Sequence, residues 1–152
     1  MRRALLASAV ALFALGGAAV AQNPNLPPAY GTLNLNAGFL PDPQVVNVVA
    51  GGNIDARRLG GQCVGAIANP PDVRLNYRAG SFPLFISVQS NTDTTLVINL
   101  PNGQWLCNDD FQGLNPGVIL QNPPSGQYDI WVGTFGGGTA PAQVLVSEVP
   151  PR

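Results

Sequence analysis

Short runs of alternating apolar and polar residues constrain the fold of this chain more than any other feature. In the clearest run, Asp72–Arg78, the side chains of Val73, Leu75 and Tyr77 share one face. Period-2 runs of about four to eight residues, bounded by glycine, proline, asparagine or aspartate, are typical of half-buried strands. No window after residue 21 keeps a helical period, and the 15 prolines interrupt most candidates. The sequence therefore predicts an all-β protein.

Similar runs recur at short spacing from Gln44 onward. They are Gln44–Ala50, Val64–Ala68, Asp72–Arg78, Phe82–Val88, Leu96–Leu100, Gln104–Asn108, Val118–Gln121, Gln127–Thr134 and Gln143–Val149. About eight to ten short strands at this spacing predict an antiparallel β-sandwich. In the run Gln127–Thr134, Tyr128, Ile130 and Val132 share one face, and Asp129, Trp131 and Gly133 share the other.

The first 21 residues have the features of an export signal. Two arginines precede an uncharged apolar run, Ala4–Ala18, and Ala19-Val20-Ala21 fits a cleavage site. The run is shorter than the roughly 20 apolar residues that a membrane-spanning helix needs. We therefore expect an exported protein, periplasmic or secreted, with no transmembrane segment in the mature chain.

The rest of the chain divides into a segment rich in proline and asparagine, Gln22–Pro43, and a β-sandwich domain, residues 44–152. The Asn-Pro, Pro-Pro and Pro-Asp-Pro sequences of the first segment predict extended, loosely held backbone. Leu33 and Leu35 alternate with polar neighbours, so we expect one short strand there to dock on the domain.

The absence of histidine and lysine excludes several classes of enzyme. Nucleophilic sites of the Ser-His-Asp or Cys-His kind need an imidazole, and Schiff-base chemistry needs a lysine. Removal of the export signal leaves five arginines (7 − 2) against eight acids, a net charge of −3. Binding to nucleic acid or to a membrane through a basic face is therefore not expected.

Two cysteines, Cys63 and Cys107, would remain after export. An even number in an oxidising compartment predicts a disulfide between them. Two buried free thiols are the alternative. Two cysteines without histidine are too few ligands for an ordinary zinc site.

Three aspartates in two expected loops form a candidate calcium site. Asp93 precedes one expected strand, and Asp109 and Asp110 follow another. Calcium takes about six to eight oxygen ligands, which these carboxylates and neighbouring amides could supply if the two loops meet. The alternative is that the same residues only begin turns. No other cofactor is suggested.

A carboxylate-based hydrolase is the enzyme class that survives these exclusions. Such chemistry needs two carboxylates that face each other about 5–10 Å apart. Asp129 joins the three loop aspartates as a fourth candidate. Asp109 and Asp110 are adjacent, however, and would point to opposite faces in extended backbone. We therefore do not expect an enzyme.

Two aromatic residues near the end of the run Gln127–Thr134 are candidate ligand-binding residues. If Tyr128 faces the core, Trp131 faces outward, with Phe135 just beyond it. An exposed tryptophan could form a platform for a sugar or a peptide. Two alternatives would bury Trp131, as is usual for tryptophan. The segment Gln22–Pro43 could cover it, or the face assignment could be inverted so that Trp131 faces the core.

One ordered set of short motifs resembles a known family. The motifs are Asp93-Thr94-Thr95-Leu96, Asn102-Gly103, Asn108-Asp109-Asp110 and Gly126-Gln127-Tyr128. Their order and spacing resemble the bacterial pre-peptidase C-terminal (PPC) domain family, loosely over Gln44–Val149. The resemblance implies a jelly-roll-like β-sandwich that accompanies secreted enzymes, and some relatives bind calcium or extracellular polymers such as collagen.

Together these features favour a non-catalytic binding or scaffold module, stabilised by calcium at the aspartate loops. Its partner would be an extracellular or envelope polymer or protein. A structural protein that self-assembles through exposed sheet edges is the first alternative, and a carboxylate-based hydrolase is the second.

Overall fold

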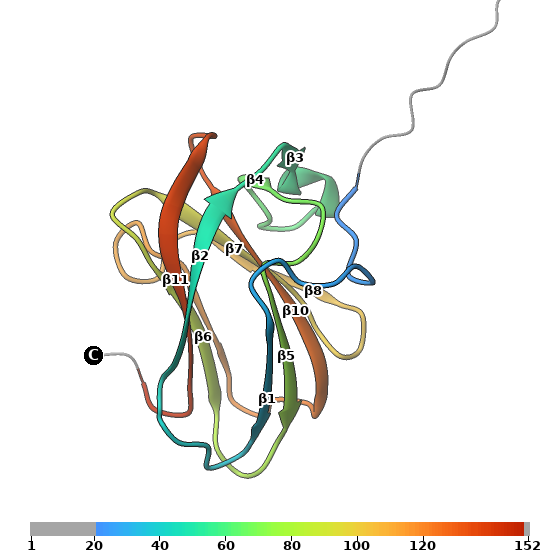
Figure 1. Ribbon diagram of the computed structural model, residues 1–152, viewed down its shortest axis with the longest axis vertical. Coiled ribbons are helices and arrows are strands. Elements are labelled where there is room, and N and C mark those ends of the chain that lie inside the picture. The colour runs from blue at the N-terminus through green and yellow to red at the C-terminus, as the bar shows by residue number, and fades with distance from the viewer. Residues whose placement is uncertain (1–20, 151–152) are drawn as a thin grey trace, which may run out of the picture.

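The computed structural model describes residues 21–150 and contains two β-sheets packed face to face (Figure 1). The strands are β1 Thr32–Asn36, β2 Gln44–Gly51, β3 Ile54–Asp55, β4 Ala66–Ile67, β5 Val73–Arg78, β6 Leu84–Gln89, β7 Thr94–Asn99, β8 Trp105–Asn108, β9 Gly117–Leu120, β10 Gly126–Thr134 and β11 Thr139–Ser147. A short 3₁₀-helix, η1, spans Ala56–Leu59, and no α-helix occurs in the described range. The predicted all-β sandwich is confirmed.

The smaller sheet has four antiparallel strands in the order β2-β11-β6-β9. In the larger sheet β10 is central: β5 and then β4 pair with one edge of it, and β7 pairs with the other edge. Strand β8 extends the sheet beyond β7, and β3 extends it beyond β4. In Figure 1 strands β2, β11 and β6 lie on the left and strands β1, β5 and β10 on the right, so the two sheets form two layers.

The main core lies between the two layers. Its largest buried side chains come from alternate positions of the central strands: Val73, Leu75, Tyr77, Leu84, Ile86, Val88, Leu96, Ile98, Tyr128, Ile130, Val132, Val144 and Val146. The faces predicted for Asp72–Arg78 and Gln127–Thr134 are therefore confirmed. Burying whole alternate faces of several strands is the main stabilising term for such a domain.

Strand β1 departs from the antiparallel prediction. It pairs in parallel with β5, from Thr32 opposite Arg74 to Asn36 opposite Arg78. A parallel pair cannot be joined by a tight turn, and here β2, β3 and β4 lie between the two strands in the chain. The predicted docking strand of the N-terminal segment is thus present, but it runs parallel to its neighbour β5 rather than antiparallel.

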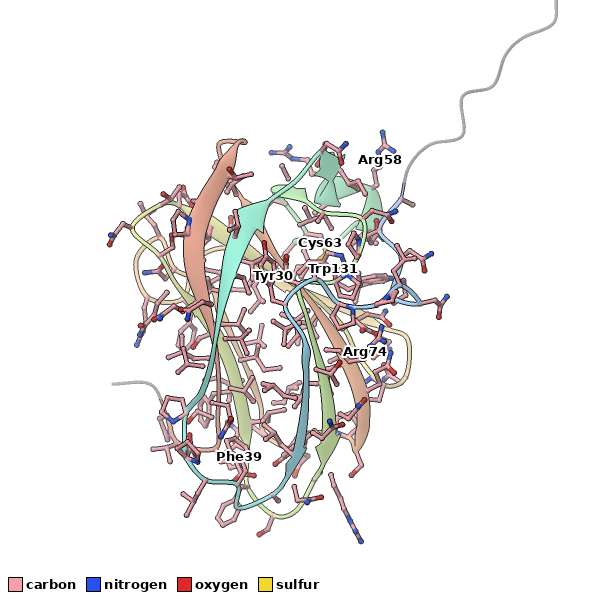
Figure 2. All side chains as sticks on the ribbon, in the orientation of Figure 1. Tyr30, Phe39, Arg58, Cys63, Arg74 and Trp131 are labelled. Atoms are coloured by element: carbon pink, nitrogen blue, oxygen red, sulfur yellow. A yellow bond between two sulfur atoms is a disulfide. The ribbon has the colours of Figure 1, made fainter. Side chains whose placement is uncertain are left out.

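The N-terminal segment is held more firmly than its composition predicts. The Arg74 guanidinium donates hydrogen bonds from Nη2 to the carbonyl oxygens of Pro24 (2.6 Å) and Leu26 (3.0 Å). The amide of Tyr30 donates to the Asp72 carbonyl oxygen at 2.8 Å. Figure 2 shows Tyr30 and Arg74 where the segment reaches the larger sheet. The expectation of a loosely held segment is wrong there, because a side chain distant in sequence satisfies its carbonyl groups.

A second, smaller core lies on the outer face of the larger sheet. It contains Ile54, Ala56, Cys63, Ile67, Val97 and Trp131, with Leu59, Trp105 and Cys107 packed against it. Its cover is the segment β3-η1-β4, whose side chains pack against Val97 of β7 and Trp131 of β10. Gly133 permits this close approach, since a Cβ atom there would lie 2.9 Å from Ile67 Cγ2 and 3.0 Å from the Ala66 carbonyl oxygen of the cover.

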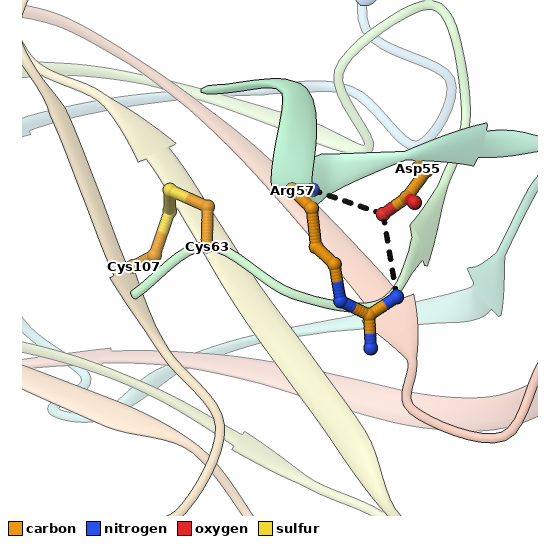
Figure 3. Close-up of a disulfide and its surroundings, with 4 residues drawn as sticks. All are labelled: Asp55, Arg57, Cys63 and Cys107. Carbon is orange, nitrogen blue, oxygen red and sulfur yellow. Dashed lines mark hydrogen bonds and ion pairs between the residues drawn. A yellow bond between two sulfur atoms is a disulfide. The ribbon is translucent and has the colours of Figure 1, made fainter. Parts of the chain in front are cut away.

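The predicted disulfide joins Cys63 to Cys107 and ties this cover to strand β8 (Figure 3). Next to it, the Asp55 carboxylate caps η1, because its Oδ1 accepts a hydrogen bond from the Arg57 amide at 3.0 Å. The bridge closes a loop with a sequence separation of 44, which corresponds to about 4 kcal/mol of stabilisation on the chain-entropy model. The disulfide therefore holds the second core in place.

The predicted export signal, residues 1–21, lies outside the described residues except for Ala21. Among the residues that the structure does describe, no helix has the length and apolar character needed to cross a bilayer.

Candidate functional site

A hollow of about 720 Å³ lies on the outer face of the four-stranded sheet, at the end where loops β6–β7 and β8–β9 meet. Its lining contains six carboxamide side chains and no charged residue: Asn47, Gln89, Asn91, Gln112, Asn115 and Gln143. We call this hollow the carboxamide groove. Carboxamides carry both donors and acceptors, so the groove offers both kinds of hydrogen-bonding group without a net charge.

Three of the six carboxamides form a row across the sheet. Gln143 on β11 lies opposite Asn47 on β2 and also opposite Gln89 on β6. Residues directly opposite each other on neighbouring strands point to the same face of a sheet, which places all three side chains on the floor of the groove. Gln143 Nε2 donates a hydrogen bond to Asn47 Oδ1 at 2.8 Å, so part of the row is already ordered.

Ser90 and Asn115 fix the loops that form the wall of the groove. The Ser90 amide donates to Asn115 Oδ1 at 2.9 Å, which joins loop β6–β7 to loop β8–β9. Ser90 Oγ donates to the Pro141 carbonyl oxygen at 2.8 Å and accepts from the Thr92 amide at 3.1 Å. The amide and the hydroxyl of Ser90 thereby hold two loops and strand β11 together, so the wall is preorganised.

The aspartates of the predicted calcium site lie in these same two loops. Partial burial raises the pKa of Asp93, and the negative charges of Asp110 and Asp109 raise it further. The loops that carry the three carboxylates are therefore close enough to interact. Asn108 serves as a local hydrogen-bonding group instead, since its Oδ1 accepts from the Gly117 amide at 2.9 Å.

The three aspartates do not by themselves form a coordination shell. Within residues 21–150, no group of three or more aspartate, glutamate, histidine or cysteine side chains is arranged so that it could hold a metal ion. A calcium ion at Asp93, Asp109 and Asp110 stays a prediction, for which amide and carbonyl oxygens of the loops would have to complete the shell.

The calcium prediction is tested by the thermal midpoint of residues 22–152 with excess calcium and with a chelator. An ion at about a hundredfold excess over its dissociation constant stabilises the native state by about 2.7 kcal/mol, which raises the midpoint by several degrees. The shift should be lost in Asp109→Asn and kept in the control Asp55→Asn, since the Asp55 carboxylate caps η1 and lies in neither of the two loops. An unchanged midpoint would leave the three aspartates as turn residues.

The structure separates Asp129 from the other candidate acids. Its Oδ1 accepts from Arg74 Nε at 2.7 Å, and its Oδ2 accepts from Gln127 Nε2 at 2.8 Å. This carboxylate is buried and fully engaged as the partner of the arginine that holds the N-terminal segment. It therefore does not act as the second carboxylate of a hydrolytic pair.

The interpretation of Trp131 as an exposed platform is wrong. The side chain points away from the main core, as its position in β10 predicted, but it is 0% exposed because the second core covers it. Figure 2 shows it close to Cys63 of the covering segment. The cover is β3-η1-β4 rather than the segment Gln22–Pro43. Phe135 is 49% exposed, and its role in ligand binding stays a prediction.

Asp72, at the start of the run Asp72–Arg78, is a buried acid. It lies where β10 changes its pairing partner, between Ile130 opposite Val73 and Thr134 opposite Ala66. The Val132 amide in this gap donates to Asp72 Oδ2 at 2.6 Å. Burial raises the pKa of Asp72 to about 7, although the hydrogen bond from Val132 opposes the rise. Asp72 is therefore a structural acid that titrates near neutral pH.

Comparison with known proteins assigns no family. No family model matches the chain, and no curated protein matches it. One solved structure with some similarity is PliG of Aeromonas hydrophila, a periplasmic lysozyme inhibitor of g-type lysozyme. It is 14% identical, the match covers 77% of this chain and 96% of that one, and the TM-score is 0.43. At this level of similarity, nothing is transferred from that protein to this chain.

Proposed function

We propose that this protein is an exported, non-catalytic module that binds a neutral polysaccharide in the carboxamide groove. The observation that carries the proposal is the lining of the groove: six carboxamides, no charged side chain and a volume of about 720 Å³. A glycan strand presents many hydroxyl groups, each of which donates and accepts. Carboxamides match such groups, because each also donates and accepts.

The charge of the lining separates this ligand class from others. An anionic polymer would require arginines, and the lining contains none. A cationic polymer would require carboxylates, and the lining contains none, because Asp93, Asp109 and Asp110 of loops β6–β7 and β8–β9 are not among the lining residues. Carboxamides also neither gain nor lose a proton near neutral pH, so the lining supports binding and supplies no general acid or base.

The resemblance to the PPC domain family also supports a polymer-binding role, because some members of that family bind extracellular polymers. It remains a resemblance in four short motifs, which here fall at the start of β7, in the β7–β8 turn, at the end of β8 and at the start of β10. In this proposal a calcium ion at the neighbouring aspartate loops would stiffen the wall of the groove.

The groove predicts binding to insoluble neutral polysaccharides. Purified protein would be incubated with cellulose, chitin and starch, and the bound fraction measured after sedimentation. We expect binding to at least one of the three, with about a tenfold loss of affinity in Gln89→Ala or Gln112→Ala, since each removes a hydrogen-bonding group worth about 1 kcal/mol or more.

The matched control is Gln62→Ala, an exposed carboxamide in the segment that covers the larger sheet. This variant should bind like the unchanged protein. The proposal fails if no polysaccharide is retained, or if the control variant and the groove variants lose binding equally. A parallel assay for released sugars should show no turnover, and turnover would return the carboxylate-based hydrolase to consideration.

A further inference from the structure

Strand β2 is a long and unprotected edge of the four-stranded sheet. It pairs with β11 on one side and has no strand on the other among the described residues. Its eight residues, Gln44–Gly51, include no charge and no proline. Natural sheets usually shield such an edge with lysine, proline, a bulge or a covering loop, because an open edge pairs readily with another chain.

The register with β11 determines which backbone groups of β2 point away from the sheet. Val49 lies opposite Pro141, whose carbonyl oxygen accepts from Ser90 Oγ on the β6 side. Pro141 therefore directs its backbone groups toward β6, and the pair Val49–Pro141 is a non-hydrogen-bonded pair of the β2–β11 ladder. By alternation, Val45, Asn47 and Val49 present their N–H and C=O groups at the open edge.

The same three residues also expose their side chains. Val45 is 47% exposed, Val49 is 46% exposed, and Asn47 is exposed between them. Gly51 also directs its backbone groups to this edge by alternation, but it is buried. It lies so close to the neighbouring chain that a Cβ atom there would be 2.2 Å from the Gly138 carbonyl oxygen. Pro43, just before the strand, has no N–H to donate. The available edge is thus limited to three residues.

We propose that two copies of this protein pair through this edge, β2 antiparallel to β2, with a twofold axis at Asn47. This register places Val45 opposite Val49 of the second copy, Asn47 opposite Asn47, and Val49 opposite Val45. It is the one twofold register that uses all three available residues of both strands. Each of the three pairs exchanges two backbone hydrogen bonds, and the two four-stranded sheets become one continuous sheet.

The side chains of this edge are complementary to a second copy of themselves. Valine meets valine twice on the outer face, which is a favourable cross-strand pair. Asn47 meets Asn47, so the row Asn47–Gln143–Gln89 continues into the same row of the second copy. Stacked carboxamides of this kind add hydrogen bonds along a sheet. The two carboxamide grooves then run into each other across the axis.

The charge of the edge also favours a second copy. A strand that pairs with itself brings identical charges together, and β2 has none. The nearest acid, Asp42, would lie beyond the pairs and opposite Gly52 of the second copy, so no like charges meet. Pairing of a single strand buries less than the roughly 1,200 Å² of a standard stable interface. We therefore expect a dimer that forms reversibly and only at high protein concentration.

Single cysteine substitutions test the register directly, because the two native cysteines are already bonded to each other. Asn47→Cys places two thiols opposite each other, with Cα atoms about 5.5 Å apart, which suits a disulfide. In Val45→Cys the two thiols are four residues out of register, about 14 Å apart, and cannot bridge. The same holds for Val49→Cys alone, but a mixture of the two variants should form a mixed disulfide.

Cross-linking under mild oxidation distinguishes the proposed β2–β2 register from no pairing and from non-specific contact. Asn47→Cys should give mainly a covalent dimer, while Val45→Cys and Val49→Cys should stay monomeric separately and cross-link when mixed. No dimer of Asn47→Cys, or equal cross-linking of all three single variants, would overturn the proposal. Without substitution, sedimentation velocity should show a rise in sedimentation coefficient with concentration.

A proline variant provides the matched loss of pairing. Asn47→Pro removes one outward N–H and no backbone hydrogen bond to β11, and proline is tolerated at such an edge position. It also removes the exposed side-chain hydrogen bond from Gln143 Nε2 to Asn47 Oδ1. We expect its concentration dependence to disappear while its thermal midpoint stays close to that of the unchanged protein. The dimer does not depend on the proposed glycan, because self-association is measured without it, so either proposal can fail alone.

Discussion

Replacing Trp131 by alanine is expected to lower the free energy of unfolding by about 3–5 kcal/mol, the usual cost of truncating a fully buried large aromatic side chain. Trp131 is the largest fully buried side chain in the described chain and the centre of the second core. Its ring packs on Trp105 with the centroids 5.4 Å apart, and its Nε1 donates to the Asn69 carbonyl oxygen at 3.4 Å. Urea unfolding followed by circular dichroism measures the loss.

Trp105→Ala is the matched control for this substitution. Trp105 belongs to the same aromatic pair but is only half-buried, so its truncation leaves less of a cavity. We expect it to cost clearly less than Trp131→Ala. A loss below about 1 kcal/mol for Trp131→Ala would mean that the covering segment β3-η1-β4 is not packed on the sheet.

Asp72 is expected to make the protein more stable at pH 5 than at pH 8. The pKa of this carboxyl is raised to about 7 in the folded protein from an ordinary value of 3.8, so the folded state binds a proton between these pH values that the unfolded state has lost. Stability therefore falls as pH rises from about 4 to about 7 and is level above that. The contribution of this one group is on the order of 4 kcal/mol.

Asp72→Asn isolates this effect. Its side-chain oxygen can still accept the hydrogen bond from the Val132 amide, but it cannot ionise. The variant should match the unchanged protein near pH 4 and be the more stable of the two at pH 8. Urea midpoints of both proteins, measured at both pH values, give the change in stability with pH for each. Other titrating groups contribute equally to the two proteins, so the difference between these changes reports on Asp72 alone.

Asp72→Ala separates the hydrogen bond from the charge. It leaves the buried Val132 amide without a partner, which costs about 1–3 kcal/mol, so it should be less stable than Asp72→Asn at every pH. Equal pH dependence in Asp72→Asn and the unchanged protein would show that Asp72 is not the titrating group.

The strands and their inward faces could be predicted from the sequence, because a side-chain period of two is a local property of extended backbone. Alternation alone puts Val73, Leu75 and Tyr77 on one face, and all three are buried in the main core. The disulfide could be predicted as well, since the chain has two cysteines and the features of an exported protein. Trp131 marks the limit of this reasoning. Its side chain points away from the main core, as alternation with Tyr128 predicts, but it is buried by the second core instead of being exposed to solvent.

The tertiary structure decided what lies on each face and which strands are neighbours. The cover over Trp131, the parallel pairing of β1, and the position of Asp72 where β10 changes partner all depend on contacts between residues distant in sequence. The carboxamide groove is the same kind of feature, because Asn47, Gln89 and Gln143 form a row only in the register of three strands. Alternation tells which side chains share a face of one strand, whereas pairing depends on the free energy of packing the whole chain.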